Sequence, residues 1–152
     1  MVGAATRGHG YFREDFTEIH GLTWVDVQYA PEFPFIAPEF LERLTRADLV
    51  IAHNAPFDIR VLRGTLEHYR LTGVEFDYFC TCRAARRVWP ELPSHSLDAL
   101  AAHIGHEFHQ RHAQADAEAA GRVLLARMKH ANATSPSDFL REAGMAPQRF
   151  RE

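Results

Sequence analysis

The sequence has few cysteines and no long apolar run, and these absences narrow the classes of protein to consider. Its 152 residues include only two cysteines, Cys80 and Cys82, and a two-cysteine zinc site would need two further ligands nearby. No apolar run approaches the roughly 18 residues of a transmembrane helix, and residues 1–10 lack the apolar segment of a signal peptide. We therefore expect a cytoplasmic protein in which both cysteines are buried thiols that share one face of a strand.

A surplus of positive charge is also absent, since 17 lysines and arginines face 20 acidic residues and the net charge is −3. Such a chain has no global attraction to nucleic acid, so local basic clusters and metal ions would have to hold a polynucleotide. Arg83, Arg86 and Arg87 form one such cluster, although arginines on a helix are more often simply solvated. The composition is that of one ordinary globular domain.

The pattern of apolar residues predicts an α/β domain with two short strands. Strands are expected over residues 49–53 and 76–81, and helices over 38–46, 56–70, 83–88, 97–104 and 113–129. Thr23 and Ser96 are candidate helix caps, and Ser135 or Ser137 would cap a small helix near the C-terminus. Residues 1–10 are interpreted as a loose terminus, 11–130 as the domain, and 131–152 as that small helix with a charged tail.

The junction at residues 48–58 carries the strongest functional signal. An apolar strand is followed at once by His53-Asn-Ala-Pro-Phe-Asp58, in which Asn54 can cap a helix through its side-chain oxygen and Pro56 suits the first turn. Asp58 then lies one turn inside the helix, near the strand end. Ligands of open α/β sheets bind at strand ends, so Asp58 is placed for chemistry. As a single residue it could equally be an acid that compensates the helix dipole.

Four segments resemble the DnaQ-like 3′–5′ exonucleases, the DEDDh subgroup of the ribonuclease H-like superfamily that contains the epsilon-type subunit of DNA polymerase III. They are Phe16–Thr23, His53–Asp58, Cys80–Leu100 and Ala113–Ala119. A single six-residue motif would be weak evidence, whereas four segments in the right order are strong. The resemblance implies an α/β exonuclease domain of the ribonuclease H-like fold.

The resemblance also implies phosphodiester hydrolysis at the 3′ end of DNA or RNA by two Mg²⁺ or Mn²⁺ ions held by four carboxylates. It makes Asp58 and Asp116 catalytic metal ligands, and it places His53, Asn54, Phe57 and Arg111 against the nucleic acid. A histidine that takes the proton of the attacking water completes the family's site. Taken alone, Asp116 would be an ordinary acid in the first turn of a helix.

The sequence departs from the family at its beginning. The family starts with a strand carrying Asp-x-Glu and two more strands, and the residues before Phe12 are too few and too poor in β-forming types to supply them. Glu14, Asp15 and Glu18 have neither the spacing nor the strand context, so they are interpreted as surface acids. We therefore expect a truncated fold with two strands and flanking helices, and a metal site that lacks two of its carboxylates.

A second departure concerns the histidine, which in the family lies five residues before the aspartate of the third motif. This chain has Arg111 at that position, and arginine stays protonated and cannot act as a base. His112 is the candidate general base if the loop is shifted by one residue, and otherwise it is a spectator. His103, His106, His109 and His112 also raise the alternative of a zinc protein, but the helix end at Gly105 prevents the first two from sharing one helical face.

Two functions stay open at this point. The first is an impaired metal-dependent exonuclease, and the second is a non-catalytic module of the same fold that binds nucleic acid or a protein partner. Without the family's first strand, the strand at 49–53 has an open apolar edge. We expect the chain to form a homodimer, to aggregate, or to accept a strand from a partner at that edge.

Overall fold

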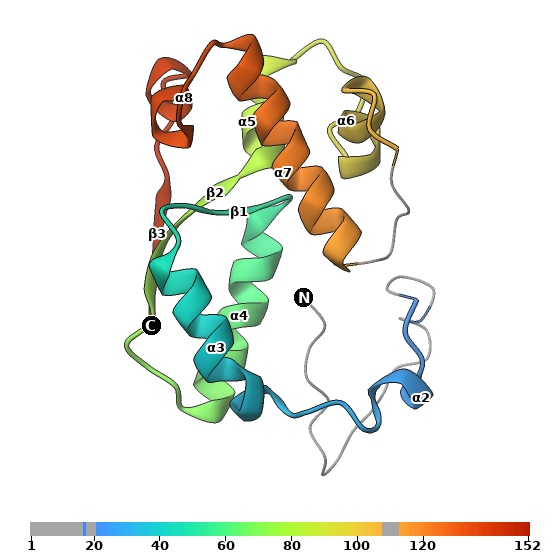
Figure 1. Ribbon diagram of the computed structural model, residues 1–152, viewed down its shortest axis with the longest axis vertical. Coiled ribbons are helices and arrows are strands. Elements are labelled where there is room, and N and C mark those ends of the chain that lie inside the picture. The colour runs from blue at the N-terminus through green and yellow to red at the C-terminus, as the bar shows by residue number, and fades with distance from the viewer. Residues whose placement is uncertain (1–16, 18–20, 108–112) are drawn as a thin grey trace.

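The computed structural model describes Thr17 and residues 21–107 and 113–152 (Figure 1). Its centre is a three-stranded sheet in the order β1-β2-β3. β1 (Val50–Ala52) pairs in parallel with β2 (Glu75–Cys80), and β3 (Gln148–Arg151) pairs antiparallel with β2. The predicted α/β class and both predicted strands are confirmed.

Helices cover both faces of this sheet. The helices in the described ranges are α2 (Trp24–Val27), α3 (Phe33–Arg46), α4 (Ala55–Tyr69), α5 (Thr81–Val88), α6 (Leu97–His103), α7 (Ala113–His130) and α8 (Pro136–Glu142). Successive strand residues point to opposite faces, so Phe76 and Tyr78 pack with α3 and α4, whereas Phe79 packs with α7 and α8. No helix in the described ranges is long and apolar enough to cross a membrane.

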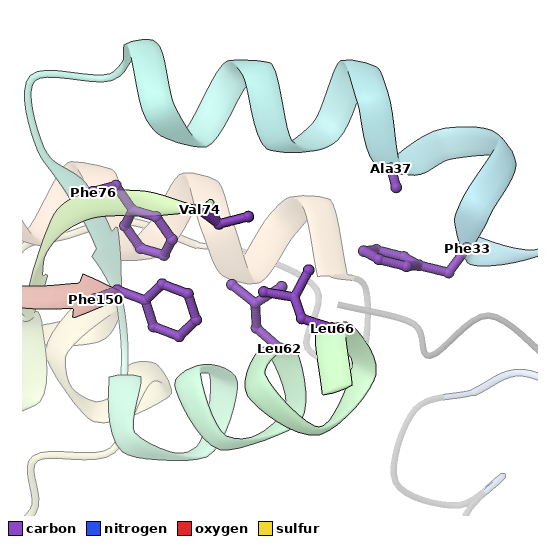
Figure 2. Packing of buried hydrophobic residues seen from close by; sticks show 7 residues of the cluster. All are labelled: Phe33, Ala37, Leu62, Leu66, Val74, Phe76 and Phe150. Atoms are coloured by element: carbon purple, nitrogen blue, oxygen red, sulfur yellow. The ribbon is translucent and has the colours of Figure 1, made fainter. Parts of the chain in front are cut away.

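The core on the α3–α4 side is built around aromatic rings (Figure 2). Phe150 of β3 is fully buried and stacks on Phe76 of β2, with ring centroids 4.8 Å apart. Leu62 and Leu66 of α4 close the cluster against Phe33 of α3. Buried aromatic pairs of this kind contribute strongly to stability, so β3 is an integral part of the fold.

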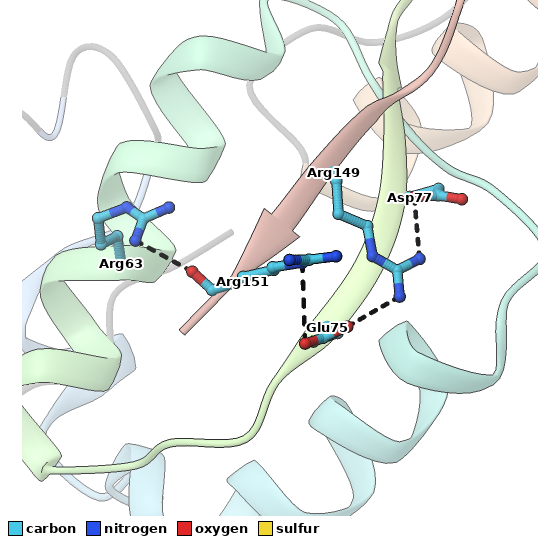
Figure 3. Close-up of polar contacts among 5 residues, drawn as sticks. All are labelled: Arg63, Glu75, Asp77, Arg149 and Arg151. Atoms are coloured by element: carbon cyan, nitrogen blue, oxygen red, sulfur yellow. Dashed lines mark hydrogen bonds and ion pairs between the residues drawn. The ribbon is translucent and has the colours of Figure 1, made fainter.

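The sequence did not indicate β3, whose residues were expected to form a charged tail. Three of its four residues are polar, so only Phe150 signals burial. Arg149 donates hydrogen bonds to Glu75 and to Asp77, at 2.9 and 3.0 Å, along the exposed side of the β2–β3 pair (Figure 3). Exposed ion pairs stabilise a fold only weakly, and the ring of Phe150 therefore does most to hold this strand in place.

Two local expectations are wrong. The helix α3 starts at Phe33, five residues before the start predicted at residue 38, and it contains Pro38 in its interior. An interior proline removes a helical hydrogen bond, but burial of Phe33 and Ala37 in the core outweighs that loss. The two cysteines do not share a strand face either, because Cys80 ends β2 while Cys82 lies in α5.

Thr23, Ser96 and Ser135 all occupy the cap positions predicted for them. Thr23 takes part in a capping box at the start of α2, in which its backbone N–H donates to the carboxylate of Asp26 at 2.8 Å. Ser135 begins α8 and its hydroxyl oxygen accepts a hydrogen bond from the backbone N–H of Asp138 at 3.1 Å. Ser96 occupies the cap position of α6, but its side chain makes no capping hydrogen bond.

β1 lies at one edge of the sheet. Its three residues are half-buried, with Val50 packed toward α3 and α4 and Ile51 packed toward α7 and α8. Within the described part of the chain, no strand pairs with the side of β1 that faces away from β2. The backbone groups on that side are the unpaired edge that the sequence analysis anticipated.

Candidate functional site

Four of the predicted site residues, His53, Asn54, Phe57 and Asp58, lie at the carboxyl end of β1 and in the first turn of α4. β1 ends at Ala52 and leads into α4, and β2 ends at Cys80 and leads directly into α5. Because the strands are parallel, these two ends lie at the same edge of the sheet, where α/β proteins bind their ligands. The helix α7 contacts β1, and its amino-terminal half passes the end of that strand (Figure 1).

The sharp turn from β1 into α4 is made by Asn54. Its backbone is left-handed, with φ 62° and ψ 43°, a conformation that asparagine tolerates better than most residues. The predicted cap by the Asn54 side chain is wrong, because no backbone N–H of the helix donates a hydrogen bond to that side chain. Instead the backbone carbonyl of Asn54 accepts from the N–H of Phe57 at 2.9 Å. The side chain of Asn54 is exposed at the site.

His53 connects three separate segments at this junction. Its Nδ1 lies 3.0 Å from Oγ1 of Thr81, and its Nε2 lies 3.0 Å from the backbone oxygen of His95. A carbonyl only accepts hydrogen bonds, so Nε2 carries the proton and Nδ1 of the neutral ring accepts from the Thr81 hydroxyl. His95 is fixed in turn through its Nε2, 2.9 Å from the backbone oxygen of Trp89. His53 thus ties the end of β1 to the start of α5 and to the loop before α6.

The ring of His53 is held neutral by its surroundings. Burial lowers its pKa, and the positive charge of Arg86 acts in the same direction, while the bond to His95 and the charges of Asp98 and Asp58 oppose the change. Both ring nitrogens are already engaged inside the chain. The predicted contact of His53 with nucleic acid stays a prediction.

Asp58 is the most unusual acid of the site. It is half-buried in the first turn of α4, and burial raises the pKa of its carboxyl although the nearby His53 acts to lower it. No described cation forms an ion pair with it. A carboxylate that has lost solvent without gaining a cation is typical of functional sites. The position of Asp58 is therefore better suited to a ligand than to stabilising the helix.

Asp116 lies in the first turn of α7 and is partly exposed. The second predicted acid therefore lies on the helix that passes the end of β1. Among the described residues, however, no three His, Cys, Asp or Glu side chains come together as a metal site. Mg²⁺ held by protein oxygens needs several anionic ligands or substrate phosphates. The two acids do not fit a complete two-metal site, and we derive no reaction step through one.

Several predicted residues lie outside the described ranges. They are Arg111, His112 and His109, together with Glu14, Asp15 and Glu18. Phe57 is described and is 56% exposed beside the site, as a residue that meets a ligand would be. His103 packs edge-on against Trp89, with ring centroids 4.9 Å apart, and no described histidine takes part in a three-ligand group.

Two residues that hold the site together were missed. Thr81 is 1% exposed and, with His95, anchors His53. Thr81 comes directly after the last residue of a strand. A hydroxyl at that position could have been recognised in the sequence as a hydrogen-bonding group at the strand end. The predicted basic cluster is also divided: Arg86 lies toward His53, whereas Arg83 donates a hydrogen bond to Gln148 at 2.8 Å and Arg87 lies by Gly144.

The fold is that of an α/β protein in which Asp58 lies beside the carboxyl end of the parallel strand β1. A family model described as an exonuclease matches residues 11–124, so the chain belongs to this exonuclease family. The predicted membership of the DnaQ-like branch, within the ribonuclease H-like superfamily, is confirmed. The three-stranded sheet with its helices corresponds to a truncated domain of that fold.

Curated relatives are PolC-type DNA polymerases III. Those of Streptococcus thermophilus (strain ATCC BAA-491 / LMD-9) and Streptococcus pneumoniae serotype 2 (strain D39 / NCTC 7466) are each 32% identical over 114 residues, 74% of this chain. That of Streptococcus pyogenes serotype M18 is 30% identical over 120 residues, 75% of this chain. The chain spans only 8% of the length of each of these relatives.

The depressed pKa of His53 predicts that the fold loses stability in mild acid. The unfolded chain takes up a proton at the ordinary pKa of 6.5, before the folded chain does. The unfolded state therefore binds more protons in this window, and the free energy of unfolding falls as the pH drops below that value. Urea unfolding at about pH 7.5 and about pH 5.5 should show a larger loss for the wild type than for His53→Gln. The exposed His130→Gln variant should lose as much as the wild type, and an equal loss in all three proteins would contradict the assignment.

Proposed function

We propose that this chain is a metal-dependent 3′–5′ exonuclease domain whose hydrolytic activity is weak in its 152-residue form. The single observation that carries this proposal is Asp58, a half-buried carboxylate without a described cation at the carboxyl end of β1. Membership of the exonuclease family supports a nuclease reaction, and the reaction that we propose is phosphodiester hydrolysis at a 3′ end. The relatives are DNA polymerases by name, so DNA is the first substrate to test. We propose the cytoplasm as the location.

Asp58 and Asp116 are the proposed metal ligands, and Mg²⁺ or Mn²⁺ are the ions that suit carboxylate oxygens. Two carboxylates from separate helices offset the dehydration of such an ion only in part, which is why we expect weak activity. The exposed side chains of Asn54 and Phe57 lie beside Asp58 in sequence and would meet the terminal nucleotide. For Arg111 we propose a contact with a phosphate, and for His112 the role of general base.

The open edge of β1 is the second part of the proposal. A strand added there would lie next to the end of β1, close to Asp58, and could bring further acids to the same ion. The strand could come from a second copy of the chain or from a partner protein. This arrangement would remedy the unpaired edge and the incomplete ligand set together.

A non-catalytic binding module is the alternative. The observation that favours it is the lack of any three-ligand group within the described ranges. Such a module would keep the exposed Phe57 and Asn54 for nucleic acid or a protein partner while losing hydrolysis. The two proposals differ in their requirement for Asp58 and for a metal ion.

Release of the 3′ nucleotide from labelled single-stranded DNA in Mn²⁺ distinguishes them. The wild type should show slow release, and Asp58→Ala should reduce it by roughly tenfold or more, because a metal ligand acts on the transition state. Asp48→Ala removes an exposed acid just before β1 and should leave the rate unchanged. If no protein releases nucleotide but all retain the DNA in a gel-shift measurement, the binding module is correct and the exonuclease proposal fails.

Light-scattering chromatography at micromolar concentration tests the β1 edge. We expect a dimer or larger species, because an unpaired apolar edge pairs readily with another strand. A proline substitution at Ile51 removes a backbone N–H of β1 and should shift the chain toward monomer, provided that circular dichroism shows it folded. A wild-type chain that elutes only as a monomer would contradict the proposal.

A further inference from the structure

A pocket lies at the opposite end of α7 from Asp116. It has a volume of about 360 Å³ and opens between the carboxyl-terminal ends of α5, α7 and α8. Figure 1 shows α5 and α8 flanking that half of α7. Arg127, which lines the pocket, is eleven residues beyond Asp116, or about 16 Å along the helix axis at 1.5 Å per residue. The pocket is therefore separate from the carboxylate site.

Arg127 is held in place without using all of its hydrogen-bonding capacity. Its guanidinium carbon lies 4.7 Å from the ring centroid of Trp89, so the planar group stacks on the indole. Its Nε is buried and has no hydrogen-bond partner. A buried donor without a partner is unfavourable, and burial lowers the pKa of Arg127 as well. The side chain of Arg127 is thus held in place, while its Nε–H donor has no hydrogen-bond partner.

Arg87 brings a second guanidinium to the same pocket from another helix. It lies in the last turn of α5, and its Nη2 is so close to Gly144 that a Cβ on that residue would lie 3.1 Å away. The left-handed backbone of Gly144, with φ +61°, closes α8 at this point. Neither Arg87 nor Arg127 forms an ion pair with a described residue. Arg122 and Arg141, by contrast, each pair with an acid on their own helix.

The helix dipole explains only part of this arrangement. Both arginines lie in last turns, where a cation is favourable. That effect accounts for neither the hollow between the helices nor the buried Nε of Arg127. Glu142 also lines the pocket without forming an ion pair with either guanidinium, and the charge of Glu91 acts on Arg127 from nearby. The remaining wall is apolar and includes Val88 and Phe139.

We propose that this pocket binds a phosphoryl group carried by an organic molecule. Two guanidinium groups from different helices can hold the oxygens of one phosphate from two sides, and guanidinium geometry suits phosphate. The volume exceeds that of a bare ion, and the apolar wall can cover an attached sugar or base. The phosphoryl group could belong to a free nucleotide or to the backbone of a nucleic acid strand.

Isothermal titration of the full chain at low salt, with EDTA to exclude metal ions, tests the site. The probes are inorganic phosphate, thymidine 5′-monophosphate and a short oligothymidylate. We expect saturable binding of at least one organic phosphate, tighter than that of inorganic phosphate. Arg87→Gln should weaken it by roughly tenfold through loss of a charge-assisted hydrogen bond. Arg87 is exposed, so this variant should fold as the wild type does.

Matched controls make the result specific. Arg141→Gln removes an arginine of the neighbouring α8 that pairs with Asp138, and it should leave the affinity unchanged. Arg127→Lys keeps the charge but loses the planar fork, so it should weaken binding while preserving the fold by circular dichroism. EDTA removes the metal ion that the proposed exonuclease site requires, which separates this proposal from the exonuclease proposal. Binding of the oligonucleotide alone would identify a strand as the source, and binding of the monophosphate would identify a nucleotide.

Two results would overturn the proposal. One is the absence of saturable binding by every probe, and the other is an affinity that Arg87→Gln and Arg127→Lys leave unchanged.

Discussion

The parallel pairing of β1 with β2 aligns Val50 with Tyr78, Ile51 with Phe79 and Ala52 with Cys80. Because this register ends both strands at the same level, the helices α4 and α5 begin side by side. The ring of His53 then reaches Thr81 and His95 across that junction. Asp58 takes its position from the same turn, one helical turn beyond Asn54. The pairing thereby brings these groups to one edge of the sheet.

Stability and function make opposite demands on this junction. The buried neutral His53 and the buried hydroxyl of Thr81 satisfy each other, so they strengthen the fold. Asp58 does the reverse, because its carboxylate has lost solvent without gaining a described cation and the pKa is raised. A fold that keeps an unfavourable charge at a strand end has a group ready for a ligand. The edge of β1 beside it shows the same character, since no described strand pairs with that edge and no described cation pairs with Asp58.

Much of the fold could be predicted from the sequence, because the helices α4 and α7 and the two parallel strands have clear apolar periodicity. β3 could not, since its one buried ring lies between two arginines and only the long-range pairing with Phe76 reveals it. The start of α3 was missed because core packing overrides the expected effect of Pro38.

At the site, the order of the motifs pointed to Asp58 and Asp116 as candidate ligands. It did not indicate the hydrogen bonds that hold the neighbouring residues in place. The bonds of His53 to Thr81 and His95 span 28 and 42 residues of sequence, and no local pattern records them. Asn54 shows the same limit, because its residue type suits a side-chain cap and a left-handed turn equally well. In the structure Asn54 forms the left-handed turn and not the side-chain cap.

Thermal unfolding with and without Mn²⁺ tests the proposal that Asp58 is a metal ligand with too few partners. An ion that binds only the folded state raises the melting temperature, and tighter binding raises it more. We predict a small rise for the wild type at millimolar Mn²⁺, the same rise for Asp48→Asn, and none for Asp58→Asn. In EDTA, Asp58→Asn should melt above the wild type, because the amide removes a charge that burial disfavours. An equal Mn²⁺ shift in all three proteins, or a destabilised Asp58→Asn, would contradict the account.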